Sequence, residues 1–286
     1  MTAFDLPSQA DGQGAPGDGL TSHQPRVQER LLEAMTWPEV KAVAEQGLPV
    51  LLPLGSTEQH GPHLPLNTDC ILPTAIALKA AEQYPLVVAP PIRFGAKSRP
   101  LTGGGETFPG TLSLELVTIV GTIQQVIEGL VRSGFTKICL QGFHYENAAV
   151  AWSAADLAHR SAPVSTILVL EHAMPTVPEP ELTELFGEGF AGWEFEHAAH
   201  AETSMMMAVR PDLVRTDRII DDAAVRSPTW DVIPPPQDFI PKSGVLSRAS
   251  LSNAKAGERL IELAAAKLVE ALAAEFGSPV AEDGRP

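Results

Sequence analysis

The chain has 286 residues, a formal net charge of −15 at pH 7 and 44% hydrophobic residues. Its apolar content suffices for a large core, and its acidity argues against nucleic acid or an anionic membrane as a partner. The chain has no apolar run approaching the ~18 residues of a membrane span, and no basic-then-apolar leader opens it. We therefore expect a cytoplasmic protein.

The first 26 residues are rich in Gly, Pro, Asp, Ser and Gln and poor in large apolar side chains. Such a segment gains too little burial to offset the entropy that it would lose on ordering. We predict a disordered tail over residues 1–26 and a single folded domain over residues 27–286. Cys70 and Cys139 are the two cysteines, and their apolar surroundings predict buried thiols rather than a disulfide.

Short apolar runs alternate with helical patterns along the rest of the chain. The runs at 49–55, 86–92, 137–143 and 165–171 predict strands that are buried on both faces. Apolar spacing predicts helices at 71–83, 113–133, 146–160 and 251–276, and Ser113, Glu115 and Gly134 mark the ends of the second. This alternation favours an α/β fold with a mainly parallel sheet covered by helices on both sides.

Acidic and histidine residues follow the first and the third of these strands. Glu58, His60 and Asp69 lie in LPLGSTEQHGPHLPLNTD, and His144 and Glu146 lie in LQGFHYEN. Residues two apart in an extended segment point to the same side, which pairs Glu58 with His60 and His144 with Glu146. Ligands of open parallel sheets collect at the carboxyl ends of the strands, so we expect one site.

Imidazole and carboxylate ligands without cysteine suit Zn²⁺ or Mn²⁺. Two ions that share one carboxylate would use all five ligands and favour hydrolysis, because such ions lower the pKa of bound water and polarise a carbonyl. A single histidine after a strand is more often structural. We interpret the remaining histidines of the folded part in that way, namely His63, His159, His172 and His200.

A third cluster, GFAGWEFEHAAHAETS, contributes Trp193, Glu194, Glu196, His197 and Glu202. The glycines around it suit a loop that closes over a substrate. Trp193 is expected to cover a small planar molecule or, alternatively, to pack in the core or at an interface. His197 is a candidate for proton transfer, because the pKa of free histidine lies near neutrality.

The Gly- and Pro-rich segment 94–111 follows the second strand. It lacks the Walker spacing, so it is not a phosphate-binding loop. Ser98 and Thr102 are candidates to form hydrogen bonds with a substrate.

These segments together resemble the creatininase family from about residue 35 to residue 276. EQHGPHLPLNTD is similar to the family's first ligand motif, and HYEN (144–147) is similar to the second motif of its creatinine-hydrolysing members. The resemblance implies a three-layer α/β/α fold, a homohexamer and two divalent metal ions per subunit, Zn²⁺ and/or Mn²⁺. It implies that Glu58, Asp69 and His144 hold one ion, and that His60, Asp69 and Glu146 hold the other.

The resemblance also implies a reaction and the residues that perform it. The expected activity is hydrolysis of a cyclic amide by a metal-activated water, with creatinine and water giving creatine. His197 falls on the position of the proton-transferring histidine, and Glu146 is the second residue expected to be catalytic. The implied contacts of this small-molecule substrate are Thr102, Tyr145, Trp193, Glu194 and Glu196.

Departures from the family pattern leave the substrate open. Phe143 stands before His144 where the family has glycine, Ala173 lies near an expected aromatic, and Glu194 replaces an aspartate. The first alternative is a C–N hydrolase that acts on another small cyclic amide or on a formamide. The second is a metal-binding protein without catalysis, against which the presence of His197 argues.

Overall fold

A computed structural model of the chain describes residues 30–99, 105–163, 166–187, 190, 192–222, 230, 232–234 and 239–278. The tail predicted over residues 1–26 lies outside these ranges. The strands are β1 (Val50–Leu54), β2 (Val87–Val88), β3 (Lys137–Gly142) and β4 (Thr166–Leu170). The α-helices are α1 (Trp37–Glu45), α2 (Thr68–Ala81), α3 (Leu116–Arg132), α4 (Asn147–Ser161), α5 (Glu179–Phe186), α6 (His200–Val209) and α7 (Ala254–Phe276). The 3₁₀ helices are η2 (Leu32–Ala34), η3 (Trp193–Phe195), η4 (Pro211–Leu213) and η5 (Thr216–Arg218).

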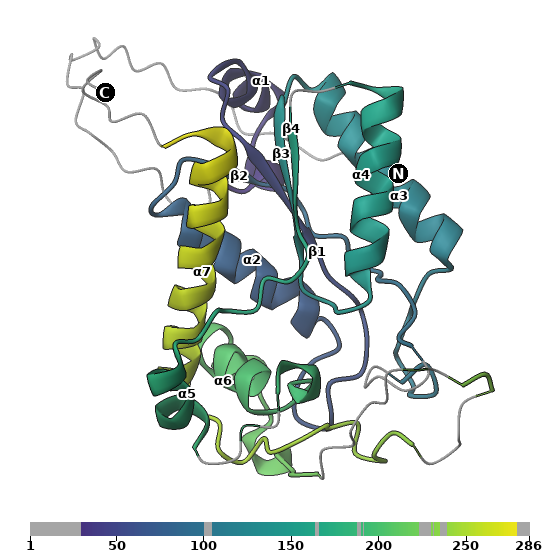
Figure 1. Ribbon diagram of the computed structural model, residues 1–286, viewed down its shortest axis with the longest axis vertical. Helices are drawn as coiled ribbons and strands as arrows, with labels where there is room; N and C mark the ends of the chain where they lie inside the picture. Colours follow the sequence, from purple (N-terminus) through teal and green to yellow (C-terminus); the bar gives the residue numbers. More distant parts are fainter. Residues whose placement is uncertain are drawn as a thin grey trace, which may run out of the picture.

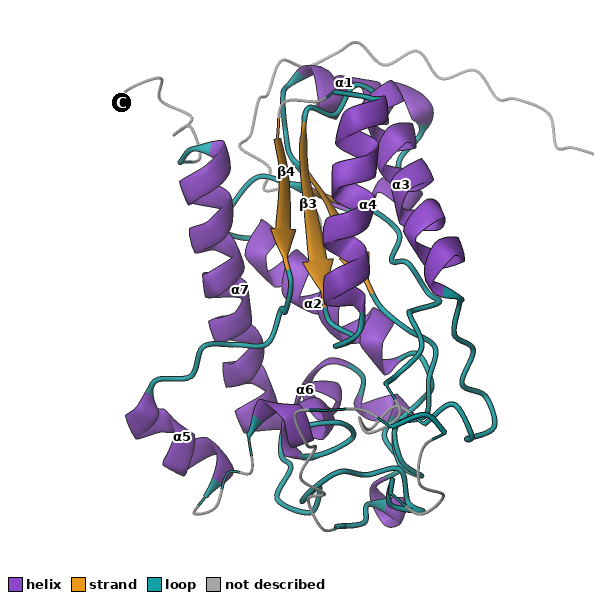
Figure 2. Ribbon diagram, turned by 45° about the vertical axis from the view of Figure 1, so that its right-hand side comes forward, coloured by secondary structure: helices purple, strands orange, loops and turns teal. Residues whose placement is uncertain are grey.

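The described strands form a parallel sheet in the order β2-β1-β3-β4. Because β2 pairs with one edge of β1 and β3 with the other, the direction in which the sheet grows reverses at β1. Open α/β sheets bind ligands outside the carboxyl ends of the strands at such a reversal. In Figure 2 the strands point toward the loop-rich end of the molecule, where α6 lies.

Helices cover both faces of the sheet (Figure 1). Val50 and Leu52 of β1 belong to the core beneath α3 and α4, whereas Leu51 belongs to the core beneath α2 and α7. This alternation follows from the pleat, which sends successive side chains to opposite faces. It confirms the α/β prediction and the three-layer α/β/α arrangement.

The second strand is shorter than the predicted run at 86–92. Its ladder ends at Val88 because Pro90 and Pro91 carry no N–H to donate to a neighbouring strand. Pairing resumes only as an isolated bridge between Leu54 and Ile92.

The helix predicted to open near Ser113 begins later, at Leu116. Leu114 pairs with Ala96 in an isolated bridge, which keeps this segment extended up to the helix. The Ser113 hydroxyl donates to the Glu106 carboxylate instead of capping the helix. At the other end, Gly134 has a φ of +100° just beyond the helix, as the prediction required.

Helix α2 begins at Thr68, before the predicted start at residue 71, so Asp69 lies in its first turn. A Cβ on Gly55, at the end of β1, would lie 2.4 Å from the Asp69 carbonyl oxygen. Only glycine allows the helix to start this close to the strand. The position of Asp69 is therefore set by the contact between α2 and the end of β1.

Cys70 and Cys139 are both buried and free, as predicted. Among the described residues, none of the helices combines the length and the apolar character needed to cross a bilayer.

Candidate metal and active site

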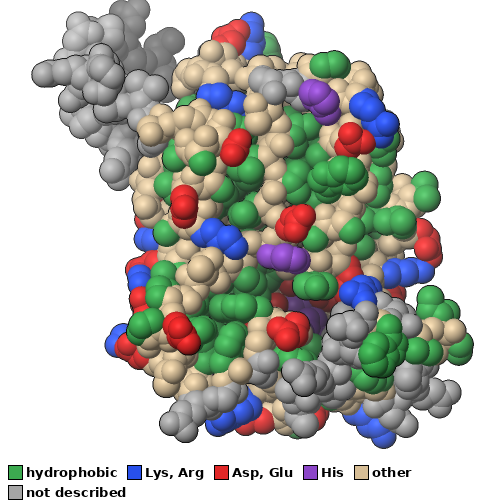
Figure 3. Space-filling view, in the orientation of Figure 1, with side chains coloured by type: hydrophobic (Ala, Val, Ile, Leu, Met, Phe, Trp, Pro, Cys, Tyr) green, Lys and Arg blue, Asp and Glu red, His purple; other side chains and the backbone are tan. Residues whose placement is uncertain are grey.

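Histidine and carboxylate side chains meet at the carboxyl ends of β1 and β3. The cluster itself is almost fully buried, and the space-filling view shows other histidine and acidic side chains near the middle of one face (Figure 3). Among the described residues, three groups of ligand atoms lie within 4.8 Å of one another. The groups are Glu58–Asp69–His144, His60–Asp69–Glu202 and Glu58–His60–His197.

Asp69 belongs to the first two groups, and it directs a different carboxylate oxygen toward each of them. Its Oδ1 lies 3.2 Å from His60 Nε2, and its Oδ2 lies 3.5 Å from His144 Nδ1. The buried Oδ2 has no hydrogen-bond partner in the described part of the chain. A carboxylate with one oxygen toward each imidazole is placed to bridge two cations.

A backbone carbonyl orients each of these imidazoles from behind. His60 Nδ1 lies 3.2 Å from the Glu58 carbonyl, and His144 Nε2 lies 2.9 Å from the Ala96 carbonyl. When these nitrogens donate their protons, lone pairs remain on His60 Nε2 and His144 Nδ1. Both lone pairs face the carboxylates, which is how metal-binding histidines are oriented in proteins.

The buried carboxylates repel one another unless positive charge lies among them. Burial raises the pKa of Glu58, and it raises the pKa of Glu202 to about 8. Burial alone would lower the pKa of His60, but the carboxylates of Asp69 and Glu202 raise it to about 10. The side chains can balance this charge only by taking up protons. A divalent cation would supply the same charge, so the donor set fits the implied ions.

Glu202 was singled out in the sequence, but it was not predicted to be a ligand. It lies in the first turn of α6, and its Oε2 is 3.6 Å from His60 Nε2. The Ala198 N–H donates to the same oxygen over 2.7 Å. Ala198 has a φ of +53°, a left-handed conformation that is uncommon for alanine and directs this N–H at Glu202.

Glu146, which was expected to hold the second ion, belongs to none of the three groups. Its Oε2 lies 3.4 Å from His144 Nε2, whereas Glu58 and Asp69 face the opposite nitrogen of that ring. Its Oε1 accepts the Arg99 N–H over 3.0 Å. Helix α4 begins directly after Glu146, so the extended geometry assumed for His144 and Glu146 does not hold. Glu202, rather than Glu146, lies beside His60 and Asp69 in the structure.

His197 lies at the edge of the cluster. Its ring centroid is 4.5 Å from that of His60, and its Nδ1 is 3.8 Å from Glu58 Oε1. Burial, together with the nearby His60, lowers the pKa of His197 to about 3. Gln59 Nε2 lies 2.8 Å from His197 Nε2. The sequence reasoning missed Gln59, although its place between Glu58 and His60 was a signal that it lies beside the site.

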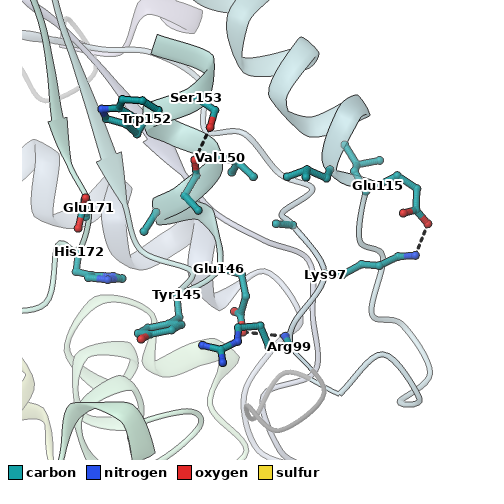
Figure 4. A pocket seen from close by; sticks show the side chains of 15 residues that line it. Lys97, Arg99, Glu115, Tyr145, Glu146, Val150, Trp152, Ser153, Glu171 and His172 are labelled. Carbon is teal, nitrogen blue, oxygen red and sulfur yellow. Dashed lines mark hydrogen bonds and ion pairs between the residues drawn. The ribbon is translucent and has the colours of Figure 1, made fainter. Parts of the chain in front are cut away.

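A cavity of about 830 Å³ adjoins the cluster on the side of Glu146 (Figure 4). Tyr145, expected to contact substrate, lines it and stacks on His172 with 5.1 Å between ring centroids and 14° between planes. Ala96, whose carbonyl orients His144, also lines the cavity. A flat molecule in this cavity would lie against this aromatic wall, next to Glu146.

The other expected substrate contacts lie elsewhere. Trp193 packs edge-on against Phe186, with 5.5 Å between ring centroids, and its neighbour Glu194 is exposed. Glu196 is buried and accepts the Ala201 N–H over 2.6 Å at the start of α6. None of Trp193, Glu194 and Glu196 lines the cavity of Figure 4. Thr102 lies outside the described residues.

Several other side chains have structural roles. The Ser98 hydroxyl, a candidate for substrate binding, donates to Glu58 Oε2 over 3.2 Å. Phe143 is buried in the core beneath α2 and α7 and does not line the cavity. His63 bonds to Thr203 over 2.9 Å, and His200 packs against Phe186. These two contacts agree with the structural roles predicted for both histidines.

A parallel sheet with a buried histidine–carboxylate cluster at its reversal point suits a hydrolase that uses metal ions. The family model "Creatininase: Creatinine amidohydrolase" matches residues 33–272. The chain belongs to the creatininase family and is a hydrolase that acts on C–N bonds.

Relatives with known names differ in their substrates. Creatinine amidohydrolase of Pseudomonas putida is 37% identical over 248 residues, which cover 85% of this chain and 95% of that protein. The mycofactocin precursor peptide peptidase of Mycolicibacterium smegmatis is 30% identical, covering 74% of this chain and 78% of the relative.

Solved creatininase structures share the fold. One described as creatininase Mn superposes with a TM-score of 0.81 at 36% identity, covering 86% of this chain and 98% of the other. A mutant creatininase of Zn-Zn type gives a TM-score of 0.80 at 35% identity, with the same coverage.

Proposed function

We propose that the chain hydrolyses a cyclic amide and that its reaction is the opening of creatinine to creatine. The identity to the Pseudomonas enzyme and the motif HYEN (144–147) support this substrate. One observation carries the proposal: Asp69 directs one oxygen to His60 and the other to His144, and each imidazole has a further carboxylate beside it. This is a donor set for a pair of cations, and a pair of cations suits hydrolysis.

In this proposal each subunit holds two divalent ions, Zn²⁺ and/or Mn²⁺. Glu58, Asp69 and His144 would hold one ion, and His60, Asp69 and Glu202 would hold the other. Bound there, the ions would polarise the amide carbonyl and lower the pKa of water. The relatives solved in Mn and Zn-Zn forms support this choice of metals.

The remaining side chains would bind and orient the ring. Tyr145 and His172 offer a stacked aromatic wall beside the cluster. Glu146, which lines the cavity, and His197, beside Glu58, would exchange protons with the reacting atoms. The attacking water must lose a proton and the departing ring nitrogen must gain one, so two such groups meet the need.

Trp193, Glu194 and Glu196 would contact substrate only after the η3 segment moves. Glycine-flanked segments of this kind often close over a substrate. Gly192, directly before Trp193, has a φ of +118°, which glycine adopts readily, and it is the hinge that this movement would use.

A second candidate keeps the chemistry and changes the substrate to a peptide amide. The 30% identity to a peptide peptidase favours it, as does a cavity of about 830 Å³, which is larger than a five-membered ring requires. Formamides and other small cyclic amides are further alternative substrates, and the same turnover experiment tests them.

The test is turnover by one metal-loaded preparation of creatinine, a hydantoin, a lactam, a formamide and a short unblocked peptide. We expect creatinine to have the highest kcat/KM. A peptide or formamide turned over faster than creatinine would replace the proposed substrate and leave the metal chemistry standing. No hydrolysis of any of them by metal-loaded protein would contradict the proposal as a whole.

We also propose that the protein is a homohexamer of the cytoplasm. Leu116, Val117 and Trp152, on α3 and α4, are large apolar side chains that a single subunit leaves exposed, and burial between subunits would remove them from water. Light scattering on the purified protein tests the assembly, since a monomer at micromolar concentration would contradict it. Fractionation of the source cells tests the location.

A further inference from the structure

Gln59 lies between two candidate ligands, and its side chain contacts His197 rather than the cluster. Its Nε2 is 2.8 Å from His197 Nε2 and 3.0 Å from the Gly244 carbonyl oxygen. Its Oε1 accepts the Gly61 N–H over 2.9 Å.

Backbone groups decide which way the Gln59 amide points. The Gly61 N–H can only donate and the Gly244 carbonyl can only accept, so oxygen must face Gly61 and nitrogen must face Gly244. Reversing the amide would set two donors against each other at one end and two acceptors at the other. The assignment therefore follows from the backbone and does not depend on His197.

The chain around Gln59 is built closely against this amide. A Cβ on Gly244 would lie 1.9 Å from Gln59 Oε1, so no other residue fits there without displacing the amide. The same segment also holds His197, because the Leu246 N–H donates to the His197 carbonyl over 3.2 Å. Gln59 and His197 are thus fixed relative to each other from both sides.

A fixed donor on one ring nitrogen determines where the ring carries its proton. Gln59 Nε2 can only donate, so His197 Nε2 must accept, and a neutral ring then carries its proton on Nδ1. Nδ1 is the nitrogen that faces the cluster, 3.8 Å from Glu58 Oε1.

We propose that Gln59 is a positioning residue that fixes His197 in the Nδ1–H form. His197 then presents a hydrogen-bond donor to the reacting atoms. Nδ1 then has no lone pair left for a metal ion, although His197 lies in a candidate ligand group with Glu58 and His60. This inference rests on the proposed hydrolase function.

The test is ¹⁵N NMR of the histidine side chains in zinc-loaded protein near pH 7, which shows directly which ring nitrogen carries the proton. The variant His197→Asn assigns the signals. We expect a protonated Nδ1 and an unprotonated Nε2 on His197. Gln59→Glu has nearly the same shape but replaces the donor with an acceptor, so we expect it to move the proton to Nε2 or to protonate both nitrogens. Gln83→Glu makes the same change at an exposed position and should leave the His197 signals as they are.

Kinetics complete the test. We expect Gln59→Glu to lower kcat on the order of 100-fold, with metal content retained and KM changed far less. Gln59→Leu, which imposes neither form, should give a mixture of both ring forms and an intermediate kcat. A wild-type ring protonated on Nε2, or a His197 spectrum unchanged in Gln59→Glu, would overturn the proposal whatever the substrate is. A protein that shows the expected spectra but hydrolyses none of the amides would instead refute the proposed function.

Discussion

Glu202 Oε2 lies 3.6 Å from His60 Nε2, although the two residues come from distant parts of the chain. His60 follows β1, and Glu202 lies in the first turn of α6, so the contact joins the end of the sheet to a helix that packs beneath it. It completes a donor set with Asp69 in which every side chain is buried.

This contact predicts that Glu202 and Glu146 respond differently to the same substitution. Glu202→Gln removes a charged oxygen from the group with His60 and Asp69, so we expect loss of one ion and a fall in kcat of at least about 100-fold. Glu146→Gln should lower kcat but keep both ions, because Glu146 faces the far nitrogen of His144. Metal analysis of the dialysed variants distinguishes them. Full metal content in Glu202→Gln with a loss in Glu146→Gln would reverse the assignment.

Metal removal should destabilise the folded chain as well as inactivate it. Ions bind the assembled cluster and not the unfolded chain, so their binding adds to the free energy of unfolding. Without them, the carboxylates of Glu58, Asp69 and Glu202 remain close together and buried. We expect a chelator to lower Tm and abolish turnover, and Mn²⁺ or Zn²⁺ to restore both. Unchanged Tm and activity after verified metal loss would count against a cation site here.

Glu196 predicts a dependence of stability on pH. Burial raises the pKa of this carboxyl from 4.5 to about 7 in the folded chain. Between these values the folded state binds more protons than the unfolded state, so the free energy of unfolding falls as pH rises through this window. Glu196→Gln removes this pH dependence. The free energy of unfolding of the variant, relative to that of wild type, should therefore rise by up to about 3 kcal/mol between about pH 4 and pH 8.

Denaturant unfolding of both proteins in the same metal-loaded state measures this difference. Glu194→Gln, at an exposed neighbouring position, is the matched control. A difference in the free energy of unfolding between Glu196→Gln and wild type that stays constant over the whole pH range would show that Glu196 does not titrate in this way.

Asn147 is a structural residue on which the site depends. Its Nδ2 donates to the carbonyls of Leu54 and Gly55, over 3.2 and 3.0 Å, and its Oδ1 accepts the Ala96 N–H over 3.0 Å. Because Ala96 in turn orients His144, these bonds connect β1, the cavity wall and a ligand. Asn147→Ala should lower the free energy of unfolding by about 3 kcal/mol, since three buried backbone groups lose their partner.

Asn253→Ala provides the comparison, because Asn253 caps α7 through a single bond to the Ala256 N–H. Its expected loss is only about 1 kcal/mol. Equal losses in the two variants, measured by denaturant unfolding, would mean that the bonds of Asn147 contribute little.

The sheet, and the meeting of Glu58, His60, Asp69 and His144 at its carboxyl end, could be predicted from the sequence because both follow from local patterns. Buried strands show as apolar runs, and the residues directly after them are carried to the carboxyl ends, as for Glu58 and His144. The prediction that Glu146 points to the same side as His144 assumed an extended segment, whereas α4 begins directly after Glu146. The short β2 follows from Pro90 and Pro91, a local signal that the prediction had not weighed.

Glu202 and Gln59 illustrate what local patterns do not contain. Glu202 reaches His60 only through the packing of α6 and the left-handed turn at Ala198. Gln59 acquires its role from Gly244, far along the chain, whose carbonyl fixes the direction of the amide. Contacts of this kind depend on the tertiary fold, and the spacing of residues in the sequence does not predict them.

The most direct test of the two-cation site is a crystal structure of the metal-loaded protein with anomalous diffraction collected at the Mn or Zn absorption edge. We predict two peaks, one among Glu58, Asp69 and His144 and the other among His60, Asp69 and Glu202, with Asp69 bound to both. A single peak, or a second ion held by Glu146 with Glu202 turned away, would contradict it.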